Sequence, residues 1–393
     1  MKRRDFLGGL SSGAALAACS PQTQEANEDR STTQRFSWKI VTTWLPNFPG
    51  LGTGVNTLVR YIHELSGGRM DITIYGAGEL VPATEVFDTV SEGNAEMGHG
   101  PAYYWRGKSQ AAQFFTTIPF GLNAHEQNAW LYYGGGLELW REVYGPFNLV
   151  PFPAGNTGVQ MGGWFNRPIE NIESLRGLKM RMPGIAGEVL RRAGGIPVFL
   201  PQPEIYTALQ TGNIDAAEWV SPYNDRGLGL HQAARYYYYP GWQEPGPTLE
   251  CIVNREAWNS LPEDLQAIIR VACQATVVDM TSEFMARNAT ALEQLRSEES
   301  VELRKFPDDV LARLKVITFE VTPVSLEGVK KGVFPERNWL RHHFTTFLST
   351  ATAHFYTILC LFVVRELYVW SIYATTAKKL QERDLIPFIL LLE

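Results

Sequence analysis

The sequence predicts an α/β protein made of two related lobes and ending in long helices. Two observations lead to this expectation. Strand-like and helix-like segments alternate from Phe36 onward, as in βαβ units. Two segments also repeat each other at a constant offset of 119 residues. A chain of 393 residues with 45% hydrophobic and 19% charged residues is long and apolar enough for two hydrophobic cores.

The first predicted βαβ unit begins at Phe36, where the alternation of strand-like and helix-like segments starts. Alternating apolar side chains over residues 36–41 predict a strand. A loop rich in Gly and Pro covers residues 45–54, and apolar residues at helical spacing then predict a helix over 55–65 that stops at a Gly-Gly pair. Alternation over residues 70–74 predicts the second strand.

The repeated segments cover residues 80–98 and 199–217. Each predicts a turn with Pro, an amphipathic helix capped by Gly-Asn, and a short strand. In open α/β sheets, ligands bind beyond the carboxyl ends of the strands. The residues that follow the two short strands should therefore face a shared crevice; they are His99, Tyr103 and Tyr104 in the first lobe, and Glu218, Trp219 and Tyr223 in the second.

Residues 151–166, PFPAGNTGVQMGGWFN, predict a crossover strand that leaves the first lobe. Gly residues punctuate this apolar run. Asn156 and Gln160 supply amides that could point into the crevice. Buried amides bond to the backbone about as often as to a ligand, so both roles stay open here.

The run LRGLKMRMPG places Arg181 in a strand-like segment that ends at a Pro-Gly turn. A guanidinium matches a carboxylate with two parallel hydrogen bonds, which are among the strongest available to a side chain. Arg181 is therefore the candidate anchor for a carboxylate. The alternative is a solvated basic cluster with Arg176 and Lys179.

Glu218 ends a predicted strand in DAAEWVSPYND. An acid in this position either pairs with a base or binds a cation. The side chains of Gln160 and Glu218, with the Trp219 carbonyl, could form an oxygen-only site for a hard cation such as Na⁺ or Ca²⁺. The alternative is a salt bridge between Glu218 and Arg181 without a metal.

Composition and missing motifs exclude several classes of function. The net charge of −6 and the absence of a dense Lys/Arg stripe argue against nucleic acid as a partner. The sequence contains no nucleophile elbow, P-loop, HExxH or GxGxxG motif, so binding is favoured over catalysis. The four cysteines have no metal-binding spacing, and no obligatory disulfide framework is expected.

The first 19 residues predict an export signal. Arg3 and Arg4 resemble a twin-arginine motif, and Leu16-Ala17-Ala18-Cys19 resembles a lipobox that would leave Cys19 lipidated. A chance cysteine after small residues is the alternative. Residues 20–35 are polar and predict a flexible tether.

Residues 36 to about 318 resemble the solute receptors of TRAP transporters, the DctP family, in the branch that binds 2-oxo or 2-hydroxy monocarboxylates. The resemblance rests on SGGRMDITIYGAGELVPATEVFDTVSEG, PAGNTGVQMGGWF, LRGLKMRMPG, TGNIDAAEWVSPY and YYYYPGWQEPGPTLE. It implies a two-lobed periplasmic binding protein (type II-like), not an enzyme, that delivers its ligand to the two-part membrane permease. A homodimer is a further expectation from the resemblance.

The resemblance also implies roles for individual residues. Arg181 would hold the ligand carboxylate. Gln160, Glu218 and the Trp219 carbonyl would hold a cation, Na⁺ or Ca²⁺, that also touches the ligand, so Gln160 and Trp219 contact both. Hydrogen bonds to the ligand would come in addition from Tyr103 and Asn156.

At two positions the chain departs from the family pattern. Ser221 and Asn224 stand where the family usually has Gly and Asp. The second change removes a negative charge near the site, and the choice of cation stays open.

The expected organisation is a first lobe mainly in residues 36–155, a second mainly in 156–250, helices returning across both lobes in 251–318, and an atypical tail in 319–393. Within the tail, residues 344–364 are nearly uncharged. A swapped or amphipathic helix, a membrane span and an altered reading frame are the three interpretations.

Two alternatives to a transport receptor follow from the sequence. Twin-arginine export often serves oxidoreductases that are loaded with a cofactor, so an exported oxidoreductase is one of them. The other is a sensor, in which the ligand-bound lobes dock on a receptor without transport.

Overall fold

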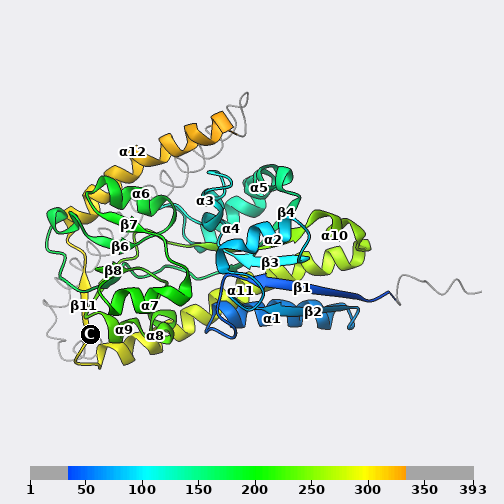
Figure 1. Cartoon of the computed structure of the whole chain (residues 1–393), viewed down its shortest axis with the longest axis horizontal. Coiled ribbons are helices and arrows are strands. Elements are labelled where there is room, and N and C mark those ends of the chain that lie inside the picture. The colour runs from blue at the N-terminus through cyan, green and yellow to red at the C-terminus, as the bar shows by residue number, and fades with distance from the viewer. Residues whose placement is uncertain (1–33, 333–393) are drawn as a thin grey trace, which may run out of the picture. The chain divides into compact units, whose positions relative to one another are not determined.

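The computed structural model describes residues 34–332, with side chains described up to Thr322. The predicted export signal, Cys19, nearly all of the predicted tether and the apolar stretch 344–364 lie outside the described residues. Residues 34–332 form two α/β lobes, each built on one mixed sheet (Figure 1). The predicted fold class is confirmed.

The first lobe contains a five-stranded sheet in the order β2-β1-β3-β10-β4. The first three strands are parallel, and β10 runs antiparallel between β3 and β4. The strands are β1 (Phe36–Thr42), β2 (Met70–Tyr75), β3 (Met97–Gly100), β4 (Leu149–Asn156) and β10 (Thr248–Asn254). The helices on this lobe are α1 (Leu51–Leu65), η2 (Ala83–Glu85), α2 (Val86–Ser91), η3 (Ala102–Trp105), α3 (Gln113–Thr116), α4 (Ala124–Tyr133), α5 (Gly136–Tyr144), η4 (Gly145–Phe147) and α10 (Arg255–Ser260).

Helix α1 begins at Leu51, four residues before the predicted start. Gly50, with φ of +69°, makes the turn into the helix, and its N–H donates to Thr53 Oγ1 at 2.9 Å. A Cβ at Gly50 would lie 2.7 Å from the Phe284 ring. Part of the predicted Gly-rich loop is therefore helix, because these glycines allow close packing and not only a turn.

The second lobe contains a six-stranded sheet in the order β11-β9-β5-β8-β6-β7. Its strands are β5 (Gly163–Phe165), β6 (Lys179–Arg181), β7 (Ile196–Val198), β8 (Ala216–Ala217), β9 (Tyr236–Tyr239) and β11 (Glu302–Lys305). Its helices are η5 (Ile172–Leu175), α6 (Gly184–Arg192), α7 (Gln202–Gln210), α8 (Pro222–Leu228) and α9 (Leu230–Ala233).

The internal repeat is visible in the topology. In the first lobe β1 pairs in parallel with both β2 and β3, and in the second β6 pairs in parallel with both β7 and β8. The repeated sequences form α2–β3 in one lobe and α7–β8 in the other. The two lobes therefore share the order strand, helix, strand, helix, strand around one central strand.

Two crossovers connect the lobes. The predicted single crossover strand is two strands, β4 in the first sheet and β5 in the second, joined by residues 157–162. The chain returns through residues 240–247, between β9 and β10. A Cβ at Gly241 would lie 2.1 Å from the Gln160 carbonyl oxygen, so only glycine lets the crossovers approach this closely.

A long helix spans both lobes. Helix α11 (Glu263–Arg296) packs on α1 and β4 of the first lobe and on α8 of the second (Figure 1). Helix α12 (Asp308–Gly332) packs on α6 and continues past the end expected for the returning helices. Residues 251–318 contain strand as well as helix, since β10 ends at Asn254 and β11 joins the second sheet.

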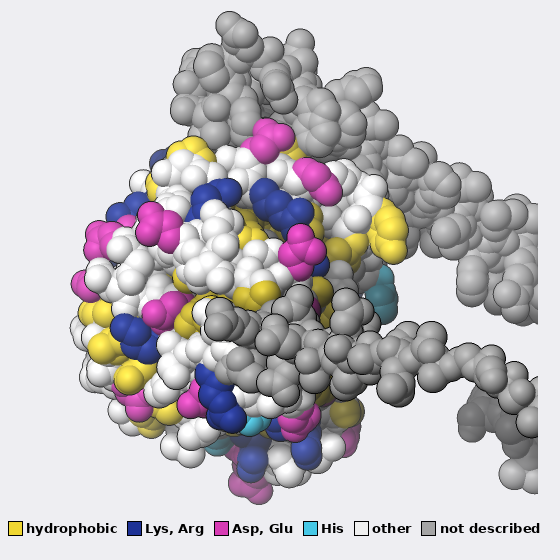
Figure 2. Space-filling view, turned by 90° about the vertical axis from the view of Figure 1, so that its right-hand side faces the viewer, with side chains coloured by type: hydrophobic (Ala, Val, Ile, Leu, Met, Phe, Trp, Pro, Cys, Tyr) yellow, Lys and Arg dark blue, Asp and Glu magenta, His cyan; other side chains and the backbone are white. Residues whose placement is uncertain are grey.

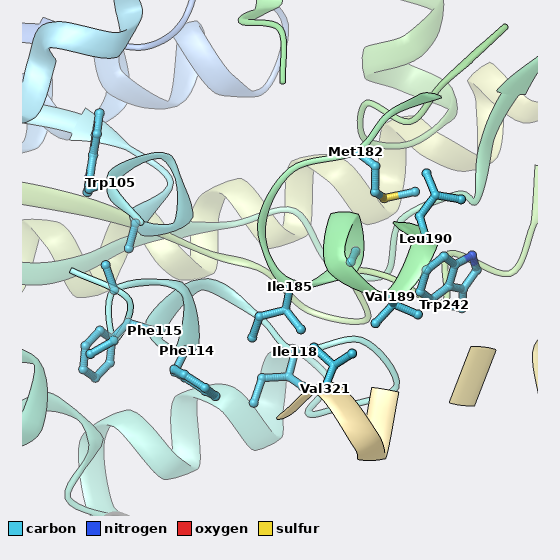
Figure 3. Packing of buried hydrophobic residues seen from close by; sticks show 14 of the residues in the cluster. Trp105, Phe114, Phe115, Ile118, Met182, Ile185, Val189, Leu190, Trp242 and Val321 are labelled. Atoms are coloured by element: carbon cyan, nitrogen blue, oxygen red, sulfur yellow. The ribbon is translucent and has the colours of Figure 1, made fainter. Parts of the chain in front are cut away.

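The lobes touch each other in this structure. Figure 3 shows a buried cluster in which Ile118 of the first lobe lies with Ile185 of α6 and Val321 of α12. Hydrogen bonds also cross between the lobes, from Leu45 N to Gln202 Oε1 at 3.0 Å, Asn224 Nδ2 to the Pro49 carbonyl at 2.5 Å, and Arg106 Nη1 to the Gly184 carbonyl at 3.3 Å. The structure is therefore a closed form.

The described surface mixes charges of both signs. Figure 2 shows Lys and Arg side chains interspersed with Asp and Glu on one face. No helix among residues 34–332 has the length and apolar character needed to cross a bilayer.

Candidate functional site

Arg181 lies at the end of β6 and is completely buried. Its guanidinium forms an ion pair with Glu218 Oε1, and it donates to the Glu218 carbonyl at 3.3 Å, the Leu200 carbonyl at 3.2 Å and Tyr104 Oη at 3.1 Å. It also lies 5.2 Å from the Trp219 ring centroid. Arg176 and Lys179 are exposed, so the solvated-cluster interpretation suits them and not Arg181.

Strand register explains why Arg181 and Glu218 meet. Arg181 of β6 is the parallel neighbour of Ala217 of β8, and the Glu218 N–H donates to the Arg181 carbonyl at 3.3 Å. The alternative predicted from the sequence, a salt bridge between these two residues, is present in this structure. This salt bridge involves only one oxygen of the Glu218 carboxylate, and the other oxygen, Oε2, has no hydrogen-bond partner among the described residues.

Two acids and one amide near Arg181 each carry a buried side-chain oxygen without a partner among the described residues: Gln160 Oε1, Glu218 Oε2 and Glu244 Oε2. Ser221 Oγ and Asn224 Oδ1 are also buried without a partner there. The Gln160 N–H donates to the Glu244 carbonyl at 3.1 Å, which ties the first crossover to the second. Unpaired carboxylate and amide oxygens are the ligands that Na⁺ and Ca²⁺ prefer. The donor set fits a hard cation.

Electrostatics at the site follow from burial. Burial raises the pKa of Glu218 more than the Arg181 guanidinium lowers it. Burial also raises the pKa of Glu244 well above its ordinary value, and the Glu218 carboxylate raises it further. Burial opposes the charge of Arg181, but Glu218, Tyr104, Tyr103 and Glu244 together outweigh it and raise the pKa of Arg181. A bound cation would offset the cost of two buried carboxylates.

Trp219 lies where the lobes meet. Its ring contacts Trp44 and Phe48 of the first lobe edge to face, at centroid distances of 6.3 and 6.5 Å. Its Nε1–H is buried without a partner in the described chain. The residue therefore joins the Arg181 side of the site to the first lobe.

Two tyrosines of η3 reach the site from the first lobe. Tyr104 accepts a hydrogen bond from Arg181, and Tyr103 lies next to the Glu244 carboxyl, whose pKa it lowers. Burial raises the pKa of Tyr104 to about 12, so its hydroxyl stays protonated. Beside Tyr103 and Tyr104, a cavity of about 310 Å³ opens between the lobes, also lined by Arg106 and residues of α6.

Asn156 uses its side chain within the hinge. Its Nδ2 donates to the Gly246 carbonyl at 3.1 Å, and its Oδ1 accepts from Gly158 N at 2.8 Å. The structure places Asn156 at the end of β4 and bonds it to both crossovers. Its contact with a ligand stays a prediction.

His99 and Tyr223 do not line the group around Arg181. Both ring nitrogens of His99 are used in the first lobe, on Trp44 Nε1 at 2.9 Å and the Ala154 carbonyl at 3.2 Å. Burial lowers the pKa of His99 to about 4, so its ring is neutral. Tyr223 donates to Glu283 of α11 at 3.0 Å.

Glu244 is the residue that the sequence did not single out. It lies in YYYYPGWQEPGPTLE, on the second crossover. An acid inside an aromatic run next to Pro and Gly was the available signal. The structure adds the reason, because the crossover turns this acid toward Arg181 and Gln160. Among residues 34–332, no group of three or more His, Cys, Asp or Glu side chains is assembled for a metal.

Two α/β lobes joined by two crossovers around a buried charged site define a bilobal solute-binding protein. The sequence profile of bacterial extracellular solute-binding protein family 7 (DctP) matches residues 42–323, and the chain belongs to this family. A monocarboxylate 2-oxoacid-binding periplasmic protein of Nostoc sp. (strain PCC 7120) is 43% identical over 322 residues, 82% of this chain and 88% of the relative.

Solved structures of TRAP periplasmic solute-binding proteins agree with this assignment. One from Pseudoalteromonas atlantica, with bound sodium and pyruvate, has 41% identity and a TM-score of 0.76, covering 81% of this chain and 96% of that chain. Another from Bordetella bronchiseptica, a mixed-occupancy dimer with calcium and picolinate, has 33% identity and a TM-score of 0.78, covering 87% and 99%. These relatives are solute receptors, and they give no support to an exported oxidoreductase.

A cation should stabilise the protein without any organic ligand. We expect Na⁺ or Ca²⁺, added to chelator-treated and sodium-free protein, to raise Tm by about 3 °C or more, because it would satisfy buried oxygens that lack partners. Glu244→Gln should lose most of this gain. Glu188→Gln, at the partly exposed mouth of the cavity, should keep it. Differential scanning calorimetry measures the shift, and an equal gain in Glu244→Gln would exclude Glu244 from the cation site.

Proposed function

We propose that this protein is the extracytoplasmic receptor of a TRAP transporter and binds a small 2-oxo or 2-hydroxy monocarboxylate, with pyruvate as the reference ligand, together with Na⁺ or Ca²⁺. The observation that carries the proposal is the juxtaposition of a fully buried guanidinium with three unpartnered oxygens. Arg181 would bind the carboxylate, while Gln160, Glu218 and the Trp219 carbonyl bind the cation and Glu244 stabilises it. The relatives that bind pyruvate, picolinate or 2-oxoacids support this choice.

Charge favours a monocarboxylate over a dicarboxylate. With a cation bound beside them, Glu218 and Glu244 would both be ionised despite their raised pKa values and bring two negative charges, while Arg181 brings one positive charge. With a monocarboxylate ligand the net charge of these groups is −2. One Ca²⁺ would bring this net charge to zero, and one Na⁺ would reduce it to −1. A second ligand carboxylate would meet buried acids with no further guanidinium beside them among the described site residues.

Tyr104 is the group that the ligand would rearrange first. Four of the five Arg181 N–H groups already have acceptors, two of them on Glu218. An incoming carboxylate can take the free N–H and the one that now points to the Tyr104 hydroxyl. Tyr104 and Tyr103 would then donate to the ligand, and the predicted contact from Asn156 would come from the hinge.

The proposed setting is the periplasm, where the closed lobes dock on the permease subunits. The periplasmic location of the Nostoc relative supports this setting. We further propose that the predicted lipobox attaches the mature protein to a membrane through Cys19. A sensor that docks the same closed lobes on a receptor is the remaining alternative, and uptake of labelled ligand by a strain lacking this protein separates the two.

A thermal-shift panel tests the proposed ligand class. Pyruvate, longer 2-oxo acids, lactate and a dicarboxylate are each added with Na⁺, with Ca²⁺ and with chelator in sodium-free buffer. We expect stabilisation by the monocarboxylates only, about 2.7 kcal/mol at a hundredfold excess over Kd, and only with a cation present. Stabilisation by the dicarboxylate alone would contradict the proposal.

Arg181→Ala should abolish ligand binding at millimolar concentrations. Removing one partner of a buried charge pair typically costs about 3–5 kcal/mol, which is a loss of roughly 150-fold to 5,000-fold in affinity. Arg176→Ala removes an exposed guanidinium from the same stretch and should bind as the wild type does. Isothermal titration calorimetry with pyruvate measures both, and near-native affinity of Arg181→Ala would remove Arg181 from the site.

We also propose a homodimer that uses the outer face of α11. Val271, Val278 and Met285 follow one another at seven-residue intervals, so they share one face of the helix, and they are 53%, 68% and 70% exposed. Apolar side chains in such a row are typical of helix pairing. The dimeric Bordetella bronchiseptica structure supports a self-association of this kind.

Val278→Glu should therefore shift the protein from dimer to monomer in sedimentation velocity, since it places a charge at the centre of the row. Tyr133→Glu alters a 95% exposed aromatic residue on α4 and serves as the control, which should stay dimeric. A monomeric wild type at micromolar concentration would contradict the dimer.

A further inference from the structure

Glu250 is a buried acid outside the proposed ligand and cation contacts. It lies on β10, between Gly100 of β3 and Pro153 of β4, and is completely buried. Its Oε1 accepts from Trp105 Nε1 at 2.5 Å and from Tyr144 Oη at 3.2 Å. Its Oε2 has no partner among the described residues.

The surroundings of Glu250 favour an uncharged carboxyl. Burial raises the pKa of Glu250 to about 8, although the Trp105, Tyr144 and Trp140 donors lower it. The ionisable group facing it is the Tyr144 phenol on α5, and the neighbouring Cys251 thiol lies on the other face of the strand; both are neutral at pH 7. Other ionisable groups on elements packed against β10 are engaged elsewhere: His99 with Trp44, Asp88 with Lys108, and Arg255 with the Leu149 carbonyl.

Trp105 connects this carboxyl to the site. It is the last residue of η3, the short helix that carries Tyr103 and Tyr104, and its ring contacts Tyr104 at a centroid distance of 6.0 Å. Its other face packs on Phe87 at 5.6 Å. On the far side of η3, Tyr103 N donates to Thr116 Oγ1 at 3.1 Å. Two anchors therefore fix η3, and Glu250 provides one of them.

We propose that Glu250 is a positioning residue for ligand binding: its neutral carboxyl holds the Trp105 indole and thereby sets Tyr103 and Tyr104 in the site. The proposal rests on the proposed function for its ligand. It adds a residue that acts on the site through Trp105, and it makes the binding site responsive to alkaline pH.

The direction of the pH effect follows from the raised pKa. A carboxyl that holds its proton more tightly in the folded than in the unfolded protein contributes stability that is lost as pH rises from its ordinary value through about 8. Above pH 8 the Trp105, Tyr144 and Trp140 donors would bind the charged carboxylate more strongly, but no counter-charge among the described residues faces it and burial keeps it from water. Opening the packing around η3 is the change that gives the charge access to water. The anchor of η3 should then loosen and affinity should fall.

Calorimetric titration of pyruvate with saturating Ca²⁺ at pH 7.0, 8.0 and 9.5 tests this coupling. Glu250→Gln keeps the shape and the acceptor oxygen without a titrating proton. We expect it to bind within about twofold of the wild type at pH 7.0 and at least threefold more tightly than the wild type at pH 9.5. The other ionisable groups are common to both proteins, so the ratio of their affinities isolates Glu250.

Two further variants separate positioning from general stability. Trp105→Phe removes the indole N–H and should lower affinity at pH 7.0 about tenfold, whereas Tyr144→Phe removes the other donor and should lower Tm without lowering affinity. An equal affinity loss in both, or parallel pH profiles for the wild type and Glu250→Gln, would overturn the proposal.

Hydrogen exchange tests the anchor without any ligand. At pH 9.5, amides of residues 102–106 should exchange faster in the wild type than in Glu250→Gln, while those of β1 should not differ. Equal exchange in residues 102–106 refutes the role of Glu250. If pyruvate does not bind the wild type at pH 7.0 but the exchange difference is present, the proposed ligand is wrong, while the role of Glu250 in anchoring η3 is supported.

Discussion

The buried Arg181–Glu218 ion pair is the interaction on which the rest of the site depends. Both side chains are completely buried, and two charges taken out of water cost more than their attraction returns unless the remaining donors and acceptors are also satisfied. Here they are not, since Glu218 Oε2 and the nearby Glu244 Oε2 lack partners in the described chain. A fold selected for stability alone would favour apolar residues at these positions. The arrangement is best explained by an anion and a cation that complete it.

The position of this pair follows from the topology of the lobes. Two neighbouring parallel strands end side by side, so the residue at the end of β6 and the residue after β8 meet without any long loop. The crossovers bring Gln160 and Glu244 to the same point, because Gly241 allows their backbones to touch. The proposed site therefore lies beside the crossovers, where a change in the angle between the lobes would move Tyr104 of the first lobe relative to Arg181 of the second.

The sequence predicted the parts of the site that depend on local pattern. Arg181 is predicted from a guanidinium in a strand-like run before a Pro-Gly turn and Glu218 from an acid at the end of a strand, and strand ends share an edge in α/β sheets. The role of Glu244 depends on the path of the second crossover, and the hydrophobic periodicity of a sequence does not predict the path of a loop. Asn156 shows a second limit of the sequence. Its amide side chain predicts hydrogen bonds, but the sequence does not say whether the partner is backbone or ligand.

Closure of the two lobes is balanced by the acids they bury. Contacts such as Asn224 to the Pro49 carbonyl and the apolar cluster around Ile118 and Ile185 favour the closed form. Enclosing Glu218 and Glu244 without a cation opposes it, because each carboxylate loses water and gains no full set of partners. A ligand and cation that bind only between the closed lobes remove this penalty and shift the population. In the proposed receptor, the same buried acids would bind the cation and disfavour closing while the site is empty. The proposed permease, which would recognise the closed lobes, would then encounter chiefly the loaded receptor.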